Sequence, residues 1–368
     1  MSIQLHRRRC PIRPCLEELE RRELPSALGS LSPAVRNLAA VPIHHTTLVH
    51  PDESIQAAVN AARPGTTVLL EPGVYHQSVR IGTPDLTLAG LGGAVLANPG
   101  RADDGIVVTP AGRGVTLANL TIRGFADNGV VLEAVHGLRI SHVTATDDGD
   151  YGLFPIACTG GVIEGCSASG HRDTGIYVGQ SAAVTIRDCT AFDNVNGIEV
   201  ENSRDVRVFD SRAYGNTAGV LIDLLPGLPV QRTDEILVRG NRVNANNRPN
   251  DADPHDIASA IPPGVGILVL GAKHTAVYGN TVEANHFTGV AVASTALLTQ
   301  LAGIKTSLAG IDPAPRGVTV RRNTVVHNGT SSPLPGVPGA DLLWDRSGTD
   351  NHWSANVFGT SLPAALPR

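Results

Sequence analysis

The 368-residue sequence is poor in aromatic residues, charged residues and cysteine. Aromatic side chains make up 4% and charged side chains 17% of the chain, against 42% hydrophobic residues. Enough apolar side chains are present for a core, which excludes a disordered chain, and the scarcity of charges excludes a coiled coil. The five cysteines contain no CxxC pair, so neither a zinc site nor a dense disulfide framework is indicated.

Long apolar runs and strong charge are also lacking. The longest apolar stretch, from Ala291 to Ile304, contains Thr295, Thr299 and Gln300 and falls short of the roughly 18 apolar residues of a transmembrane helix. We therefore expect no membrane span. The formal net charge of −5 gives no basic footprint for nucleic acid, so no nucleic-acid partner is expected.

Residues 1–47 have a different composition and are predicted to be a disordered leader. They contain no continuous apolar segment of the kind that a standard signal peptide requires. The segment from Leu16 to Ser26, LEELERRELPS, resembles a short element near the start of many planctomycete surface and secreted proteins. This resemblance implies an extracellular or cell-surface location, and a solvated leader without a targeting role is the alternative.

A short helix is predicted where the ordered region begins. Within residues 51–62, Asp52 or Ser54 serves as the N-cap and apolar residues such as Ile55 and Val59 recur at helical spacing. We expect this helix to close one end of a sheet structure, because an open end would expose unpaired strand edges.

The strongest signal is an internal repeat that uses the abundant glycine, 40 residues in all. A glycine followed by an alternating apolar segment recurs at Gly105, Gly129, Gly152, Gly175, Gly197, Gly219, Gly266 and Gly289. The spacings are 22–24 residues except for one of 47, which we interpret as two periods with one segment masked. A second set of short strands lies between these segments. Such a repeat is typical of a parallel β-helix, an all-β solenoid.

We expect the solenoid to span residues 48–358, followed by a tail at 359–368, with loop insertions at about 223–235, 247–263 and 293–317. Equivalent positions of successive coils stack about 4.8 Å apart. Cys166 and Cys189 are therefore expected to be neighbouring core thiols, with a disulfide as the alternative. A column of turn asparagines is assigned a structural role: Asn194, Asn216, Asn246, Asn285 and Asn328.

Several segments resemble those of bacterial parallel β-helix repeat proteins: Tyr151–Pro155, Gly175–Ser181, Gly197–Ser203 and Asp341–Asp345. The repeat as a whole is similar to the superfamily of pectate lyases, mannuronan C5-epimerases and NosD-type periplasmic proteins. The resemblance implies a single-stranded right-handed parallel β-helix with an N-terminal capping helix. It does not fix the function, because one fold hosts many sites.

Strand alternation predicts which side chains leave the core. Phe154, Tyr177 and Glu199 share one outward column with two leucines, and Glu201 and Asp223 share the next. The carboxylates would stack at a spacing of about 4.8 Å and repel one another, which raises a pKa, recruits a cation or leaves them solvated. We predict a lateral cleft here, walled by the insertions, and a solvated face is the alternative.

The second insertion contains Asp253-Pro-His-Asp256, which resembles the D-P-H-[DE] motif of mannuronan C5-epimerases. In those enzymes the motif follows Tyr-Gly-x on a strand. The matching segment here is Tyr151-Gly152-Leu153, and the residues that directly follow it include neither a histidine nor an acidic residue. Coincidence is therefore the alternative, and a real site needs His255 folded over the Glu199 column.

Proton abstraction from a uronate requires a base and a group that neutralises the adjacent carboxylate. By residue type, Tyr177 or His255 is a candidate base, and Arg172 or Arg232 a candidate neutraliser. Hydrolysis could use Glu199 with Glu201 or Asp223. Phe154 and Asp173 are candidate substrate-binding residues beside them.

No residue is assigned as a metal ligand, and no cofactor is required by the sequence. A weak Ca²⁺ site in the turn Asp147-Asp148-Gly149-Asp150 is the alternative to simple turn chemistry. The sequence does not specify the oligomeric state.

The expected partner is a polysaccharide or oligosaccharide. The first hypothesis is a polysaccharide lyase or C5-epimerase, with a glycoside hydrolase less favoured, acting in the lateral groove. The second is a non-catalytic carbohydrate-binding or structural surface protein, and the third is a NosD-like periplasmic accessory protein.

Overall fold

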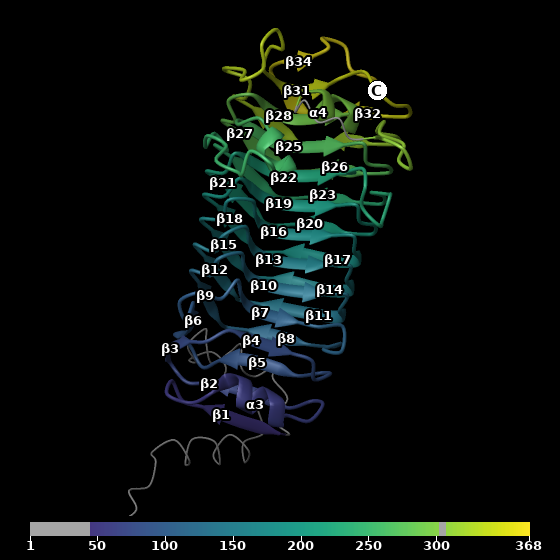
Figure 1. Cartoon of the computed structure of the whole chain (residues 1–368). Coiled ribbons are helices and arrows are strands. Elements are labelled where there is room, and N and C mark those ends of the chain that lie inside the picture. Colours follow the sequence, from purple (N-terminus) through teal and green to yellow (C-terminus); the bar gives the residue numbers. More distant parts are fainter. Residues whose placement is uncertain (1–44, 302–306) are drawn as a thin grey trace, which may run out of the picture. The chain divides into compact units, whose positions relative to one another are not determined.

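The computed structural model describes residues 45–301 and 307–368. The strands form three parallel sheets, and each coil of the chain contributes one strand to each sheet (Figure 1). Most of the predicted leader lies outside the described residues. No helix in the described ranges is long and apolar enough to cross a membrane.

Sheet A has twelve strands. They are β1 (Thr46–Val49), β2 (Thr67–Leu70), β5 (Thr87–Gly90), β8 (Thr116–Ala118), β11 (His136–Ser141), β14 (Thr159–Glu164), β17 (Ala182–Arg187), β20 (Arg207–Phe209), β23 (Leu237–Arg239), β26 (Ala276–Tyr278), β29 (Thr319–Arg321) and β32 (His352–Ser354).

Sheet B has eleven strands. They are β3 (Gly73–His76), β6 (Ala94–Ala97), β9 (Thr121–Arg123), β12 (Thr144–Thr146), β15 (Ser167–Ser169), β18 (Thr190–Phe192), β21 (Arg212–Tyr214), β24 (Arg242–Asn244), β27 (Thr281–Glu283), β30 (Thr324–Val326) and β33 (Val357–Phe358).

Sheet C also has eleven strands. They are β4 (Val79–Ile81), β7 (Asp104–Val108), β10 (Asn128–Glu133), β13 (Tyr151–Ile156), β16 (Thr174–Gly179), β19 (Asn196–Glu201), β22 (Ala218–Asp223), β25 (Val265–Leu270), β28 (Thr288–Ala293), β31 (Ala340–Trp344) and β34 (Ser361–Leu362). In the strands from β7 to β28 the repeated glycine is the second residue.

The predicted helix at the start of the domain is confirmed. Helix α3 (Ile55–Ala61) begins after Ser54, whose hydroxyl accepts a hydrogen bond from the Ala57 amide at 3.1 Å, and it buries Ile55 and Val59. Among the described residues the other helices are α4 (Thr295–Leu301) and the short 3-10 helix η2 (Ile257–Ala260), which lie within two of the predicted insertions.

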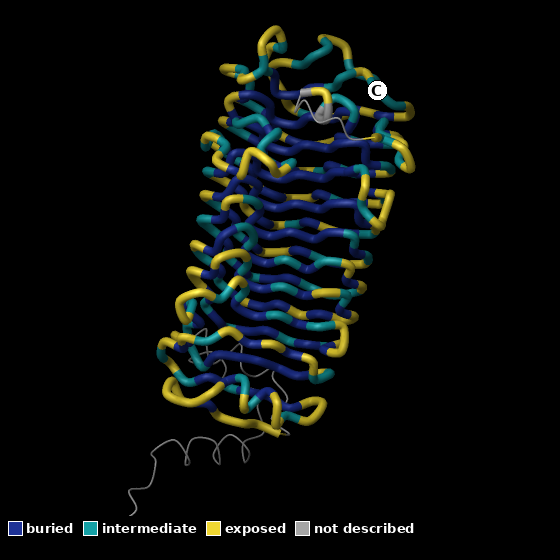
Figure 2. Tube along the Cα trace, in the orientation of Figure 1, coloured by how far each residue is buried: buried dark blue, intermediate teal, exposed yellow. Residues whose placement is uncertain are grey.

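The core is a stack of aliphatic ladders between the three sheets (Figure 2). The first inward position after the repeated glycine forms one buried ladder: Ile106, Val130, Leu153, Ile176, Ile198, Val220, Ile267, Val290 and Leu342. This ladder confirms the predicted alternation and explains why the chain needs few aromatic residues.

The 47-residue spacing between Gly219 and Gly266 is one coil, so its interpretation as two periods is wrong. Strand β22 pairs directly with β25, with Val220 opposite Ile267. The extra length lies in the segments 224–236 and 245–264, which leave the coil and return to it. The last coil also continues to Leu362 in β34, beyond the predicted boundary at residue 358.

The turn asparagines form a hydrogen-bonded ladder, as predicted. From Asn216 to Asn328 each side-chain Oδ1 accepts from the backbone amide and from the Nδ2 group of the asparagine one coil earlier. For Asn216 these donors belong to Asn194, at 3.0 and 3.1 Å. The repeated glycine makes room for this ladder. A Cβ at Gly197 would lie 2.5 Å from the Gly219 carbonyl oxygen and 2.8 Å from Asn216 Nδ2.

Cys166 and Cys189 are free, buried thiols, so the core-thiol prediction is confirmed and the disulfide alternative is not. A neighbouring column has the same hydrogen-bond pattern as the asparagine ladder, in which a side-chain oxygen accepts from the backbone amide one coil earlier. Ser211 accepts from the Cys189 amide, and Asn241 accepts from the Ser211 amide.

Candidate functional site

The predicted acidic residues lie together on the outer face of sheet C. Tyr177 of β16 pairs with Glu199 of β19, and Glu201 of β19 pairs with Asp223 of β22. One carboxylate oxygen from each of Glu199, Glu201 and Asp223 lies within 4.8 Å of the others. We call these three residues together with Asp173 the carboxylate cluster.

The predicted insertions cover the face that carries the cluster, so a small cavity stands in place of the predicted lateral cleft and the alternative of a solvated face is wrong. Glu199 is 6% and Asp223 1% exposed. The cover comes from the two insertions that follow β22 and β24: Leu225 on one side and Ile257, Ala258 and Ile261 on the other. A cavity of about 30 Å³ remains beneath this cover, which is room for one water molecule or one ion.

Hydroxyl and amide groups hold part of the cluster. The Tyr177 hydroxyl donates to Glu201 Oε1 at 2.6 Å, and the Tyr151 hydroxyl donates to Asp173 Oδ2 at 2.7 Å. The Thr174 hydroxyl lies between Asp173 and Glu199 and contacts both carboxyl groups. Asn196 Nδ2 donates to Glu199 Oε2 at 3.2 Å. These contacts fix the side chains in single orientations.

Two oxygen atoms in the same cavity have no hydrogen-bond partner. They are Asp223 Oδ1 and Asn196 Oδ1, and both residues are 1% exposed. Unpaired polar atoms at this depth are unusual in native proteins, because each loses its hydration without compensation. These two oxygens are therefore available to accept a hydrogen bond or to bind a cation.

Burial dominates the electrostatics of the cluster. It raises the pKa of Glu201 to about 7 and that of Asp173 to about 6. The pKa values of Glu199 and Asp223 are also raised, first by burial and then by the neighbouring carboxylates. Among the described residues that line the cavity there is no Arg, Lys or His to offset this charge.

The aromatic candidates pack beside the cluster. The Phe154 ring stacks on Tyr151 and Tyr177, with centroid distances of 4.4 and 4.8 Å. Burial raises the pKa of both tyrosines, so their hydroxyls stay protonated and act as donors. Phe154 thus supports the tyrosines and does not line the cavity.

The basic candidates are not brought to the cluster. Arg172 and Arg232 are exposed, and Arg232 pairs with Asp234 at 2.9 Å. His255 is exposed and does not line the cavity, so the condition set for the Asp253-Pro-His-Asp256 motif is not met. The insertion covers the cluster with Ile257, Ala258 and Ile261 in place of the imidazole.

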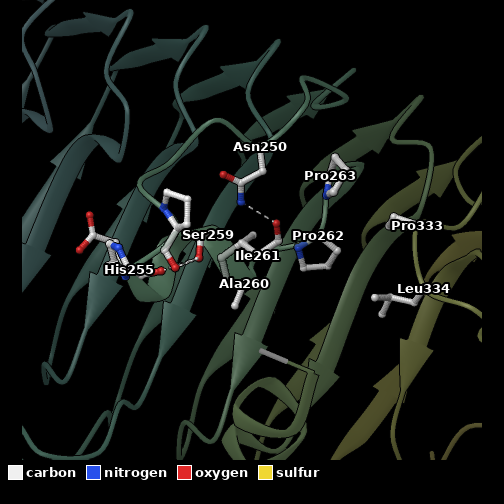
Figure 3. A pocket seen from close by; sticks show the side chains of 11 residues that line it. Asn250, His255, Ser259, Ala260, Ile261, Pro262, Pro263, Pro333 and Leu334 are labelled. Carbon is white, nitrogen blue, oxygen red and sulfur yellow. Dashed lines mark hydrogen bonds between the residues drawn. The ribbon is translucent and has the colours of Figure 1, made fainter. Parts of the chain in front are cut away.

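His255 instead lines a larger, open pocket of about 420 Å³ on the outer side of the same insertion. Figure 3 shows side chains of residues 250–263 on one side of this pocket and Pro333 and Leu334 on the other. Asn250 Nδ2 donates to the Ala258 and Ile261 carbonyls, both at 2.8 Å, and so fixes the wall. Ile261 lines both spaces and separates the pocket from the cluster.

The sequence analysis missed two polar cavity residues, Tyr151 and Asn196, the cluster contact Thr174 and the second wall of the pocket. Tyr151, Thr174 and Asn196 each stand just before a repeated glycine, so a polar residue at that position was the available signal. The loop 327–339, which contributes Pro333 and Leu334, was not predicted as an insertion.

The predicted Ca²⁺ alternative at the Asp147–Asp150 turn finds no support. Asp148 is buried and accepts the Phe125 amide at 3.0 Å, in line with the asparagine ladder. Within the described ranges, only Glu199, Glu201 and Asp223 bring three metal-ligating side chains together.

Comparison with known proteins identifies the fold. The family model described as right handed beta helix region matches residues 104–282. The A-module of the Azotobacter vinelandii mannuronan C-5 epimerase AlgE4 is 17% identical, with a TM-score of 0.62 over 84% of this chain and 91% of that one. The A-module of AlgE6 from the same organism is 17% identical, with a TM-score of 0.59 over 85% and 95%.

The periplasmic alginate epimerase AlgG is also similar, at 14% identity and a TM-score of 0.51 over 85% of this chain and 84% of that one. The search of curated protein sequences gives no match. At these identities the likeness establishes architecture and not activity. The chain therefore has a right-handed parallel β-helix fold.

Proposed function

We propose that this chain is a glycan-binding β-helix protein that holds a polysaccharide in the open pocket beside His255. The observation that carries this proposal is the pocket itself. Its volume of about 420 Å³ falls within the usual range of about 300–1,000 Å³ for small-molecule sites, whereas the 30 Å³ cavity at the carboxylate cluster excludes a sugar ring.

The lining of the pocket suits a sugar. Proline rings and Leu334 offer apolar surface to the C–H face of a pyranose, and His255, Asp256 and Ser259 offer polar groups at the rim. The charged side chain among these is a carboxylate. We therefore expect a neutral glycan to bind more tightly than a polyuronate.

The names of the similar structures, mannuronan and alginate epimerases, support a polysaccharide as the partner class and an extracellular or periplasmic location. The finer hypothesis of a lyase or C5-epimerase has less support. That chemistry requires a group that neutralises the uronate carboxylate. Neither the pocket nor the cavity has an Arg or Lys among its described lining residues.

A glycan panel tests the proposal. The purified protein is incubated with neutral glycans, alginate and pectate, with binding followed by affinity electrophoresis and turnover by absorbance of unsaturated products and by NMR of C5 inversion. We expect binding without turnover, weakened at least fivefold by His255→Ala. The matched control is His136→Ala, an exposed histidine of sheet A.

Two outcomes would overturn the proposal. Turnover of alginate or pectate would show an enzyme. Equal retardation of wild type and His255→Ala by every glycan that binds would place the binding surface elsewhere.

A further inference from the structure

The carboxylate cluster offers a set of oxygen ligands that the glycan proposal does not use. Three carboxylate oxygens lie within 4.8 Å of one another. Two oxygens bound to the same Ca²⁺ ion are at most about 4.6–5.2 Å apart, given metal–oxygen distances of about 2.3–2.6 Å. The three side chains can therefore reach one ion without rearrangement of the backbone.

An independent observation points to a ligand in the same place. Asp223 Oδ1 and Asn196 Oδ1 are buried, line the cavity and lack partners. Asn196 Nδ2 donates to Glu199 and Thr174, and the side-chain carbonyl oxygen of Asn196 is left to face the cavity. One water molecule has two protons, enough for these two oxygens, but it carries no charge to offset the carboxylates of Glu199, Glu201 and Asp223. A cation satisfies the acceptors and offsets that charge.

The type of ion follows from the donors. Carboxylate and amide oxygens are hard ligands, which select Ca²⁺, Mg²⁺ or Mn²⁺ over thiolate-preferring metals. Ca²⁺ tolerates irregular coordination, while Mg²⁺ demands near-octahedral geometry at shorter distances. The irregular arrangement of carboxylates on two adjacent strands favours Ca²⁺.

We propose that Glu199, Glu201 and Asp223, assisted by the Asn196 carbonyl oxygen, bind one Ca²⁺ ion beneath the insertions. The ion is structural, because the cavity of about 30 Å³ has no room for a sugar ring beside it. It links strands β19 and β22 at the point where the chain leaves the coil. Asn202 already fixes the start of this insertion, since its amide group donates to the Leu225 carbonyl at 2.9 Å and accepts from the Leu225 amide at 2.7 Å.

The first test uses the wild-type full chain and Ca²⁺ alone. After chelator treatment and gel filtration, equilibrium dialysis against Ca²⁺ is expected to return one ion per chain. Tb³⁺ binding gives a second signal, because the Tyr177 ring lies next to Glu201 and sensitises lanthanide luminescence. We expect tyrosine-excited Tb³⁺ emission that Ca²⁺ displaces.

The second test uses matched amide variants. Asp223→Asn and Glu199→Gln are expected to weaken Ca²⁺ binding at least tenfold. Asp148→Asn changes a buried carboxylate that does not line the cavity, and we expect it to bind within twofold of wild type. Circular dichroism checks that each variant is folded.

Three results would overturn the proposal: no stoichiometric Ca²⁺ on the folded wild type, Tb³⁺ emission that Ca²⁺ does not displace, or unchanged affinity in a folded Asp223→Asn. If the amide variants do not fold, the wild-type measurements decide alone. None of these results depends on glycan binding, so each proposal can fail without the other.

Discussion

Two stacks of polar side chains run along this β-helix and behave in opposite ways. In the asparagine ladder every amide both accepts and donates, so the column from Asn194 to Asn328 satisfies itself coil by coil. In the carboxylate cluster the stacked groups, once ionised, can only accept, and Asp223 Oδ1 is left without a partner. A solenoid can thus stack identical amides without limit, whereas stacked carboxylates require protons, outside donors or a cation.

The largest effect is expected from breaking the amide ladder. Asn216→Ala removes the acceptor for the Asn194 backbone amide and for one Nδ2 hydrogen of Asn194, whose other Nδ2 hydrogen keeps the Ala168 carbonyl. Two buried N–H groups are then left without partners. At about 1–3 kcal/mol for each orphaned group, we expect a loss of about 4 kcal/mol in the free energy of unfolding. Urea unfolding measures this loss. The control is Asn244→Ala, a half-buried position of sheet B outside the ladder, and an equal loss there would contradict the account.

Filling the space beside the ladder should have the next largest effect. A Cβ at Gly219 would lie 2.4 Å from Val243 Cγ1 and 2.8 Å from Asn246 Nδ2. We expect Gly219→Ala to cost about 2–3 kcal/mol, typical of overpacking in a core. Thermal unfolding followed by circular dichroism checks the value, and a neutral result would mean that the glycine repeat is not set by contact with the ladder.

Asp148 places a carboxylate in the column of the asparagine ladder, so it tests how a single acid behaves where the column otherwise has amides. Burial raises its pKa from 3.8 to about 7, with Asp147 adding to the shift. The folded protein then holds a proton that the unfolded chain loses, so stability falls as the pH rises from about 4 to about 7. Burial lowers the pKa of His171 to about 4, so its contribution to stability rises with pH. His171 is present in both the wild type and the Asp148→Asn variant, so it does not contribute to the difference between them.

Asp148→Asn removes the ionisation and supplies the amide that the column otherwise uses. We expect the variant to be more stable than wild type by about 2 kcal/mol at pH 8, with the difference shrinking toward pH 4. Urea unfolding at both values tests this. A difference that grows as the pH falls would reverse the sign and contradict the burial argument.

The smallest effect is expected when one carboxylate of the cluster is replaced by an amide, the group that the asparagine ladder uses. In Glu201→Gln the Oε1 acceptor for Tyr177 is kept, and the new amide can donate to the unpartnered Asp223 Oδ1 opposite it. In the presence of chelator we expect the variant to be about 1 kcal/mol more stable than wild type, because one buried unpaired charge is removed. Added Ca²⁺ should reverse this order, and destabilisation already in chelator would count against the role assigned to Glu201.

Much of the fold could be predicted from sequence because it is a local, repeated pattern. From Gly175 to Gly289 each repeated glycine stands against a ladder asparagine, so the period of the glycines reports the coil directly. The 47-residue spacing was misread because a long insertion and a masked coil look alike in sequence. Only the pairing of Val220 with Ile267 separates them.

The site was predicted in part for the same reason. Strand parity placed Tyr177, Glu199, Glu201 and Asp223 on one face, which the register confirms. It could not show that the face is covered, because the covering residues, Ile257 to Ile261, come from a loop whose path no periodicity reports. The path of this loop decides whether the carboxylates are exposed. It therefore also decides whether they can act as catalytic acids or as ligands of a buried cation.

The most direct test of the central claim is an anomalous difference map from crystals of the full chain soaked in Mn²⁺, which replaces Ca²⁺ among oxygen ligands. The account predicts one strong peak between the carboxylates of Glu199, Glu201 and Asp223, within about 2.5 Å of Asp223 Oδ1. A cavity that holds only water, with no anomalous peak at saturating Mn²⁺, would contradict it.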